Sequence, residues 1–291
     1  MSLTAAFVSV ILIWSTTPLA IKWSALDAGF SFAVFTRMAI GVMLCGALLI
    51  VLRVRLPLHG RALHSYVASG TSMWCTMILV YWSSQYVSSG MISVLFGLSP
   101  LITSLGAMIW LEEESFTPYK VTGMLLGFTG LILVFRGNLQ LGDAATVGFI
   151  TLLAAVLAQS LGLVWIKKVG DDSHPMSTTF GSLTVSLPLF FLAWWVTDGN
   201  WPDMLPIRAS AAIFYLGTVG SVLGFMMYYY MIKHMDTSRI ALITLITPVL
   251  ALLLGHGLNN EAVLPQVWFG TAFILLGLGM HRWGEKWMRL I

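Results

Sequence analysis

The sequence contains very little charge. Of its 291 residues, 15 are Lys or Arg and 12 are Asp or Glu, so only 9% are charged, whereas soluble domains carry about 25%. Apolar residues make up 58% of the chain, and the mean hydropathy is +0.87. So few charges cannot cover the surface of a soluble enzyme of this size, and so apolar a chain is not intrinsically disordered. The composition therefore indicates a protein that uses lipid as its solvent.

Cysteines and long basic runs are also scarce. Cys45 and Cys75 are the only cysteines and both lie in apolar stretches, which excludes a disulfide framework and a metal site built from several cysteines. The net charge of +3 comes without a long basic run, so we expect no nucleic-acid partner. No catalytic constellation, phosphate-binding glycine loop or ATP motif is visible in the sequence. We therefore expect no enzyme activity, no cofactor and no metal.

Ten apolar stretches are long enough to cross a bilayer core of about 30 Å, which takes about 20 helical residues. They are apolar throughout, whereas the strands of a membrane β-barrel would alternate. The connections are too short to hold a soluble domain. The sequence therefore predicts an all-α polytopic membrane protein with ten transmembrane helices, at 3–23, 29–52, 64–85, 88–111, 118–136, 145–167, 175–197, 209–232, 237–258 and 265–284.

An internal repeat relates the two halves of the chain. Each half holds five predicted spans, and because five is odd, the second copy enters the membrane from the opposite side. We therefore predict two inverted five-helix repeats, 1–140 and 141–291, an arrangement typical of secondary transporters with a substrate site near the midplane. The matched pairs are Ser99 and Thr247, Pro100 and Pro248, Glu113 and Glu261, Gly123 and Gly270, Gly130 and Gly277, Trp14 and Gln159, Ser15 and Ser160, and Lys22 and Lys167.

The distribution of Lys and Arg predicts the orientation. With the N-terminus inside, eleven of these residues fall on the cytoplasmic side and three on the outer side. Cytoplasmic connections carry the excess of positive charge, so both termini are predicted to be cytoplasmic. Lys22 is predicted to lie at the outer interface.

Several of these features resemble the drug/metabolite transporter superfamily, EamA type. They are the ten spans in two halves, Trp14-Ser15 with Pro18 in the first span, and the Ser/Thr-Pro pairs that a glutamate follows. The resemblance covers the whole chain through diffuse motifs. It implies a bacterial inner-membrane exporter of amino acids, other metabolites or toxic compounds, similar to amino-acid exporters that include an aromatic amino-acid group.

Three functions remain to be compared at this point. The first is secondary export of small metabolites, most of all amino acids, by alternating access. The second is proton-coupled export of drugs or toxic compounds. The third is an intramembrane enzyme such as a lipid-modifying transferase, which would need buried acids, bases or metal ligands. All twelve Asp and Glu fall in predicted connections or span ends, which favours a facilitator or exchanger over a proton-coupled pump or an enzyme.

The predicted substrate site consists of aromatic and polar residues within spans. Arg37 lies in the second span, where a cation costs at least about 2.5 kcal/mol, so it could hold a substrate carboxylate, snorkel or bond to carbonyls. Trp14 and Gln159 are expected to face one central cavity. Tyr81 could instead belong to an interfacial aromatic belt. The candidate substrate-binding residues are Trp14, Ser15, Thr17, Arg37, Trp74, Tyr81, Ser99, Gln159, Trp165, Tyr228 and Thr247.

Prolines and glycines suggest mechanical roles. Pro100 and Pro248 lie in the middle of the fourth and ninth spans, where a proline removes a backbone donor and bends a helix. We predict hinges there, with a packing kink as the alternative. Glycines in the fifth and tenth spans allow close helix approach. They predict a scaffold, with the protein a monomer or a weak homodimer through these two helices.

Overall fold

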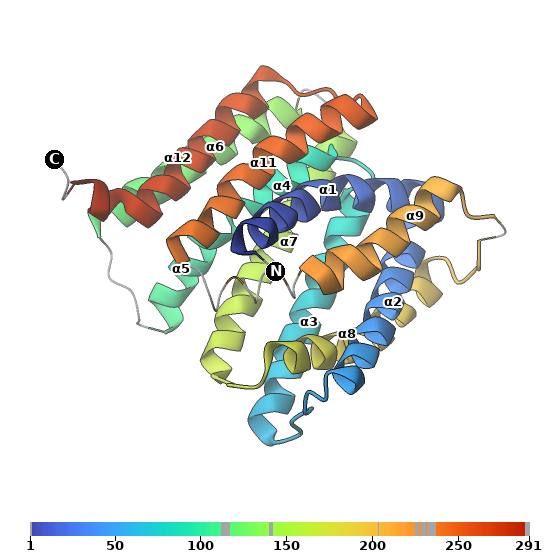
Figure 1. Ribbon diagram of the computed structural model, residues 1–291. Helices are drawn as coiled ribbons and strands as arrows, with labels where there is room; N and C mark the ends of the chain where they lie inside the picture. Colours follow the sequence, from blue (N-terminus) through green and yellow to red (C-terminus); the bar gives the residue numbers. More distant parts are fainter. Residues whose placement is uncertain are drawn as a thin grey trace.

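The computed structural model describes residues 2–111, 117–139, 142–202, 204–224, 227, 231 and 237–288, and its regular structure is helical (Figure 1). Its elements, in chain order, are α1 (Leu3–Ala28), α2 (Phe30–Val51), α3 (Gly60–Ser83), α4 (Ser89–Phe96), α5 (Ser99–Trp110), α6 (Pro118–Leu139), α7 (Asp143–Val169), α8 (Pro175–Thr197), α9 (Ile207–Tyr215), the π-helix η1 (Leu216–Leu223), α11 (Thr237–Asn259) and α12 (Pro265–Met288).

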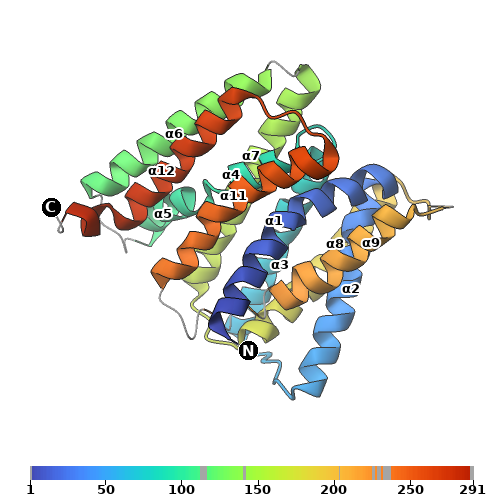
Figure 2. The ribbon, with the colours of Figure 1, turned by 45° about the horizontal axis from the view of Figure 1, so that its top comes forward.

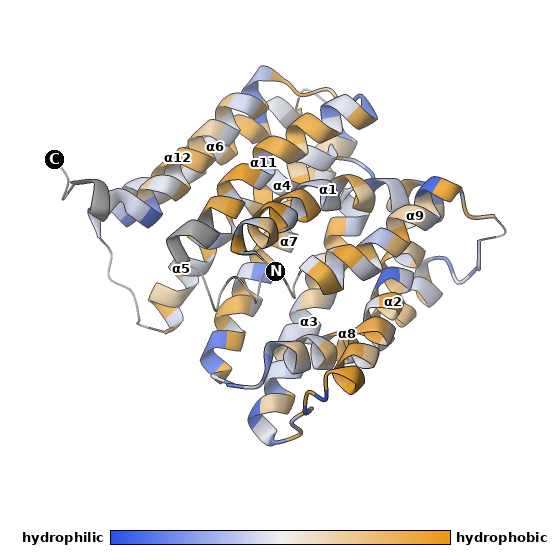
Figure 3. Ribbon diagram, in the orientation of Figure 1, coloured by the Kyte–Doolittle hydropathy of each residue, from blue (hydrophilic) through white to orange (hydrophobic). Residues whose placement is uncertain are grey.

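Over the described residues these elements form the ten predicted spans, because α4 with α5 and α9 with η1 each make one. Seven of the described helices are long and apolar enough to cross a membrane. Hydrophilic residues gather toward the helix ends (Figure 3). Leucines stay exposed on the outer faces of the bundle, for example Leu125 at 62% and Leu192 at 57%. Such an apolar exterior suits lipid as the surrounding solvent.

Connections alternate between two ends of the bundle because consecutive spans run in opposite directions. The α1–α2 turn is the single residue Gly29, whose φ of 82° is open to glycine at no steric cost. This turn and the α3–α4 and α11–α12 connections make up what we call the Glu261 end. The α2–α3 and α7–α8 connections make up the opposite end, which we call the Pro57 end.

α6 and α12, the fifth and tenth spans, lie side by side in both ribbon views (Figures 1 and 2). A Cβ on Gly123 would lie 2.6 Å from the Gly277 carbonyl oxygen, and one on Gly130 would lie 2.5 Å from that of Gly270. The sequence repeat matches Gly123 with Gly270 and Gly130 with Gly277. Each glycine therefore contacts the repeat mate of the other, which is the signature of a contact across a twofold axis. This reciprocity confirms the inverted repeat.

The fourth span is broken at its proline. α4 ends at Phe96, and Pro100 lies in the first turn of α5, where its missing N–H costs no hydrogen bond. Pro248 lies instead inside the continuous helix α11. A Cβ on Gly97, in the break, would lie 3.8 Å from Pro248 Cγ. The two proline segments therefore meet in the bundle, although only the first interrupts its helix.

We predict that Gly123→Ala destabilises the protein by roughly 1–3 kcal/mol, since the added methyl group would press on backbone atoms of α12 that cannot rotate away. Thermal unfolding of the purified protein in detergent measures this. Gly257→Ala is the matched control, because nothing lies within 4 Å of a Cβ there. An unfolding midpoint for Gly123→Ala at or above that of Gly257→Ala would contradict the packing described for α6 and α12.

Candidate functional site: a buried arginine cluster and an ion pair between the two halves

The π-helix η1 forms the second part of the eighth span. Ser221 Oγ donates a hydrogen bond to the Leu216 carbonyl oxygen, five residues earlier, at 2.9 Å. π-Helical turns are rare and frequently mark functional sites. Glycines let α1 and α2 approach this turn: a Cβ on Gly217 would lie 3.2 Å from the Arg37 carbonyl oxygen, and one on Gly220 would lie 3.8 Å from Thr17 Oγ1.

Arg37 is buried beside η1, with 6% of its surface exposed. Its Nε donates to Ser221 Oγ and its Nη1 to Tyr81 OH, both at 3.4 Å. These bonds are long, and both acceptors are neutral. Among the residues that the structure describes, no carboxylate forms an ion pair with Arg37. Within the described part of the chain, this buried guanidinium with its five donors has no matching negative charge, and an anionic group would stabilise it.

Tyr81 is fully buried, with 0% of its surface exposed. An aromatic belt at the membrane interface would leave the ring accessible, so the belt interpretation of Tyr81 is wrong. The hydroxyl group instead reaches Arg37 from α3. The cluster thus joins α2 and α3 of the first half to η1 of the second.

α1 presents two predicted residues to η1, one helical turn apart. Thr17 faces Gly220, and a Cβ on Gly224 would lie 3.4 Å from Trp14 Nε1. Nearby in sequence, Ser15 is 1% exposed. Its Oγ and the Nε1 of Trp74 are buried without a hydrogen-bond partner among the described residues. A buried donor left unsatisfied is costly, so both groups are candidates to bind a substrate.

Buried hydroxyl groups also bridge the two halves. Ser99 Oγ on α5 and Ser160 Oγ on α7 are 3.1 Å apart, and both residues are buried. In the repeat, Ser99 matches Thr247 on α11, and Ser160 matches Ser15 on α1. The helices α11 and α1 also pack against each other, around Val10 and Ile243. Gln159 precedes Ser160 and is partly buried.

Trp165 lies apart from these groups. Trp165 is 51% exposed and lines a groove of about 510 Å³ between α3 and α7, together with Ser72 and Cys75. Tyr228 lies outside the described residues. The structure therefore gathers Trp14, Thr17, Arg37 and Tyr81 around η1 and leaves Trp165 on the outer surface, because its position on α7 faces away from the bundle.

The sequence did not reveal a buried ion pair at the Glu261 end. Lys22 Nζ lies 3.6 Å from Glu261 Oε1, with 14% and 6% of the two side chains exposed, and donates to the Val87 carbonyl oxygen at 2.6 Å. Lys22 is thus buried in a contact with Glu261, which lies in a connection as the sequence predicts but is shielded from solvent. Both residues stand near span ends in the sequence, and only the packing of α1 against the α11–α12 connection buries them together.

Glu261 is held from several sides. Its Oε2 accepts hydrogen bonds from the backbone N and the Oγ of Ser89, both at 2.8 Å, and its Oε1 accepts one from Asn259 Nδ2 at 2.9 Å. The Asn259 Oδ1 accepts a bond from Trp23 Nε1 at 2.9 Å. The carboxylate is therefore fully engaged, which offsets the cost of burying its charge.

A second ion pair ties α1 to α9 at the same end. Arg208 donates to both carboxylate oxygens of Asp27, at 2.9 and 3.0 Å, and lies over the ring of Trp23. Its side chain is 53% exposed, so solvent screens this pair and it contributes little. The last two turns of α1 are thus bonded to the α3–α4 connection, to α9, to the end of α11 and to the α11–α12 connection.

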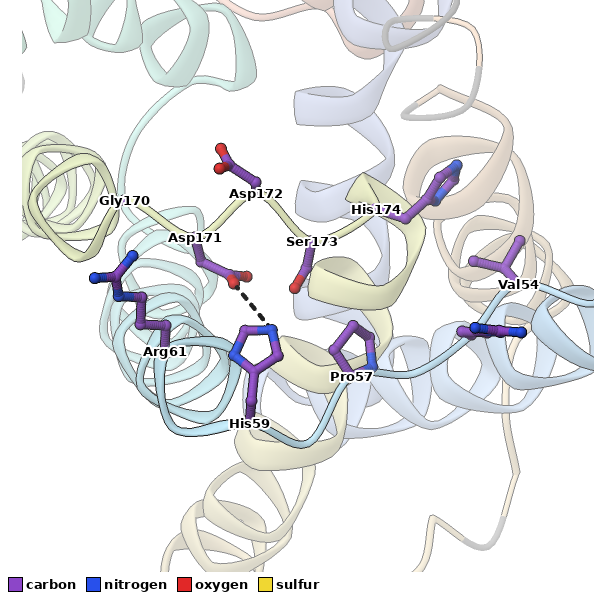
Figure 4. A pocket seen from close by; sticks show the side chains of 10 residues that line it. Val54, Pro57, His59, Arg61, Gly170, Asp171, Asp172, Ser173 and His174 are labelled. Atoms are coloured by element: carbon purple, nitrogen blue, oxygen red, sulfur yellow. Dashed lines mark ion pairs between the residues drawn. The ribbon is translucent and has the colours of Figure 1, made fainter.

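The Pro57 end contains a polar cavity of about 640 Å³ (Figure 4). His59 Nε2 lies 3.9 Å from Asp171 Oδ1 across it, and the ring nitrogens of His59 and His174 cap α3 and α8. The cavity lies among connections, away from the midplane. No group of three or more residues that could hold a metal ion occurs in the described part of the chain. Its lining is Val54, Arg55, Pro57, His59, Arg61, Gly170, Asp171, Asp172, Ser173 and His174.

Known proteins share this fold along the whole chain. One solved crystal structure superposes with a TM-score of 0.67 over 98% of this chain and 99% of its own, at 19% sequence identity. The uncharacterized transporter YoaV of Bacillus subtilis is 25% identical over 94% of both chains. A probable amino-acid metabolite efflux pump of Escherichia coli is 23% identical over 67% of this chain and 70% of its own.

The model of the EamA-like transporter family matches twice, at residues 2–136 and 146–281. The two matches cover the two halves whose glycines meet in the contact of α6 with α12. A duplicated bundle of ten spans with this match leaves no basis for the intramembrane-enzyme alternative. The chain belongs to the EamA-like transporter family of the drug/metabolite transporter superfamily, and it is a multi-pass membrane transporter.

Proposed function

We propose that the protein exports amino acids, aromatic ones included, by alternating access across the bacterial inner membrane, with both termini in the cytoplasm. The observation that carries this proposal is the buried Arg37, which has no carboxylate partner among the described residues. A substrate carboxylate would supply the missing charge in a fork geometry that suits a guanidinium. The similarity to a probable amino-acid metabolite efflux pump supports the same substrate class.

The remaining predicted residues would surround the rest of the substrate. Tyr81 contacts Arg37, and Trp14 lies beside the end of η1. Ser15 Oγ and Trp74 Nε1, which have no hydrogen-bond partner among the described residues, offer polar contacts. Ligand sites are mostly apolar with a few orienting polar groups, which suits an amphipathic neutral solute. Ser99, Gln159 and Thr247 would extend the path across the interface between the halves. Any homodimer would use the outward faces of α6 and α12, since their glycines are occupied within the chain.

The first test compares amino acids with their decarboxylated amines in proteoliposomes. We expect the wild type to prefer the amino acid and Arg37→Met to transport it at least about tenfold more slowly, because a charged hydrogen bond is lost, without slowing the amine equally. Arg208→Met, at an exposed arginine, is the matched control. Equal preference in the wild type and Arg37→Met would refute a carboxylate site at Arg37.

The break before Pro100 lies beside Pro248, so we propose that the fourth and ninth spans bend there during transport. The Pro100→Ala/Pro248→Ala double variant is expected to transport more slowly while it stays folded, because alanine favours a continuous fourth span and gives α11 back the backbone N–H that Pro248 lacks. Initial transport rates and thermal unfolding are measured together. Transport at the wild-type rate would remove the hinge proposal.

Energy coupling separates the amino-acid proposal from a proton-coupled exporter of drugs or toxic compounds. Arg37 and its described neighbours around η1 include no carboxylate to relay a proton, so we propose facilitated transport or exchange. Substrate flux down its own gradient is then expected to continue when an ionophore collapses the proton gradient. Loss of that flux would favour the proton-coupled alternative.

A further inference from the structure

We propose that Lys22 and Glu261 form a latch that holds the Glu261 end closed, and that their separation opens this end during transport. The inference rests on the alternating access of the proposed function. It assigns a step of that cycle to two residues outside the Arg37 cluster. The residues that form the latch come from opposite halves of the chain, so relative movement of the halves must act on it.

The partners of each charge show which parts would separate. Lys22 lies on α1 and also bonds to Val87, just before α4, so its side chain is anchored to the first half. Glu261 is anchored to α11: its backbone N donates to the Gly255 carbonyl oxygen at 3.1 Å, and its carbonyl oxygen bonds to His256 Nδ1 at 2.9 Å. Rotation of α11 away from α1 and α4 would therefore pull the carboxylate from Lys22 and from Ser89 together.

Close helix packing seals the space around the latch. A Cβ on Gly90 would lie 2.8 Å from Leu252 Cα, and one on Gly255 would lie 2.7 Å from Ser89 Oγ. Leu252 is 1% exposed. α4 and α11 thus meet almost backbone to backbone, and Leu252 is buried where they meet.

Burial makes the latch a two-state element. While paired, the two charges satisfy each other in an apolar setting, and once apart each needs water. An intermediate separation leaves them neither paired nor hydrated, which favours a fully shut or a fully open end. Each latch residue has a repeat mate of the same type in the opposite half: Lys22 matches Lys167, and Glu261 matches Glu113. Glu113 lies outside the described residues.

The test measures the accessibility of a buried reporter. In a background with Cys45 and Cys75 replaced by alanine, Leu252→Cys is labelled with a hydrophilic maleimide in lipid nanodiscs, where both faces are reachable. We expect Lys22→Met and Glu261→Gln each to raise the labelling rate at least about fivefold, by weakening the closed state. The Lys22→Met/Glu261→Gln double variant should match the single variants within about twofold, because the pair is lost only once.

The matched control is Asp143→Asn, which neutralises an exposed carboxylate at the start of α7 and should leave labelling unchanged. Unchanged labelling in Lys22→Met and Glu261→Gln, with both variants folded, would overturn the latch. The assay needs no substrate, so its failure is distinct from the failure of amino-acid transport.

A second measurement tests the latch in case Lys22→Met or Glu261→Gln fails to fold. A Lys22→Cys/Glu261→Cys variant, joined by a short bifunctional methanethiosulfonate, should lose at least about four fifths of its transport and regain it on reduction, since the shut state is then fixed. Transport that continues with the cross-link in place would overturn the proposal.

Discussion

The reciprocal contact of α6 with α12 is the constraint on which the architecture depends. Gly123 meets Gly277 and Gly130 meets Gly270, so the two repeats touch through matching backbone surfaces. In lipid, helices gain no hydrophobic energy by associating, and close backbone packing supplies the attraction instead. This contact holds the fifth and tenth spans together at one side of the bundle. The spans that carry the polar residues can then face each other across the rest of the interface.

The buried cations Lys22 and Arg37 stabilise their charges in two different ways. Lys22 is paired with Glu261, and the carboxylate is further held by Ser89 and Asn259. Among the described residues, Arg37 bonds to the neutral hydroxyl groups of Ser221 and Tyr81, at long distance. A paired charge stabilises one arrangement of the helices, whereas a charge without a counter-ion favours an anionic ligand. This difference separates the role proposed for the Glu261 end from that of the Arg37 cluster.

Some residues of the site could be predicted from the sequence, and others could not. Arg37, Tyr81, Trp14 and Thr17 were predicted as site residues, and they do gather around η1, because polar and charged groups within spans must turn toward protein. Trp165 was grouped with them but lies on the outer surface, since an aromatic side chain is stable against lipid as well. The ion pair of Lys22 with Glu261 could not be predicted, because the two residues lie 239 positions apart in the chain.

Hydropathy and span counting were enough to infer the ten spans, their helical character and the inverted duplication, because a bilayer sets the length and apolarity of each span and an odd span count sets the inversion. The contacts between polar groups became known from the folded chain alone. The π-helical turn at Ser221, the break before Pro100 and the burial of Glu261 depend on side-chain contacts between distant helices. Hydropathy reports the preference of each residue for lipid or water, and it contains no information about which neighbour satisfies a buried charge.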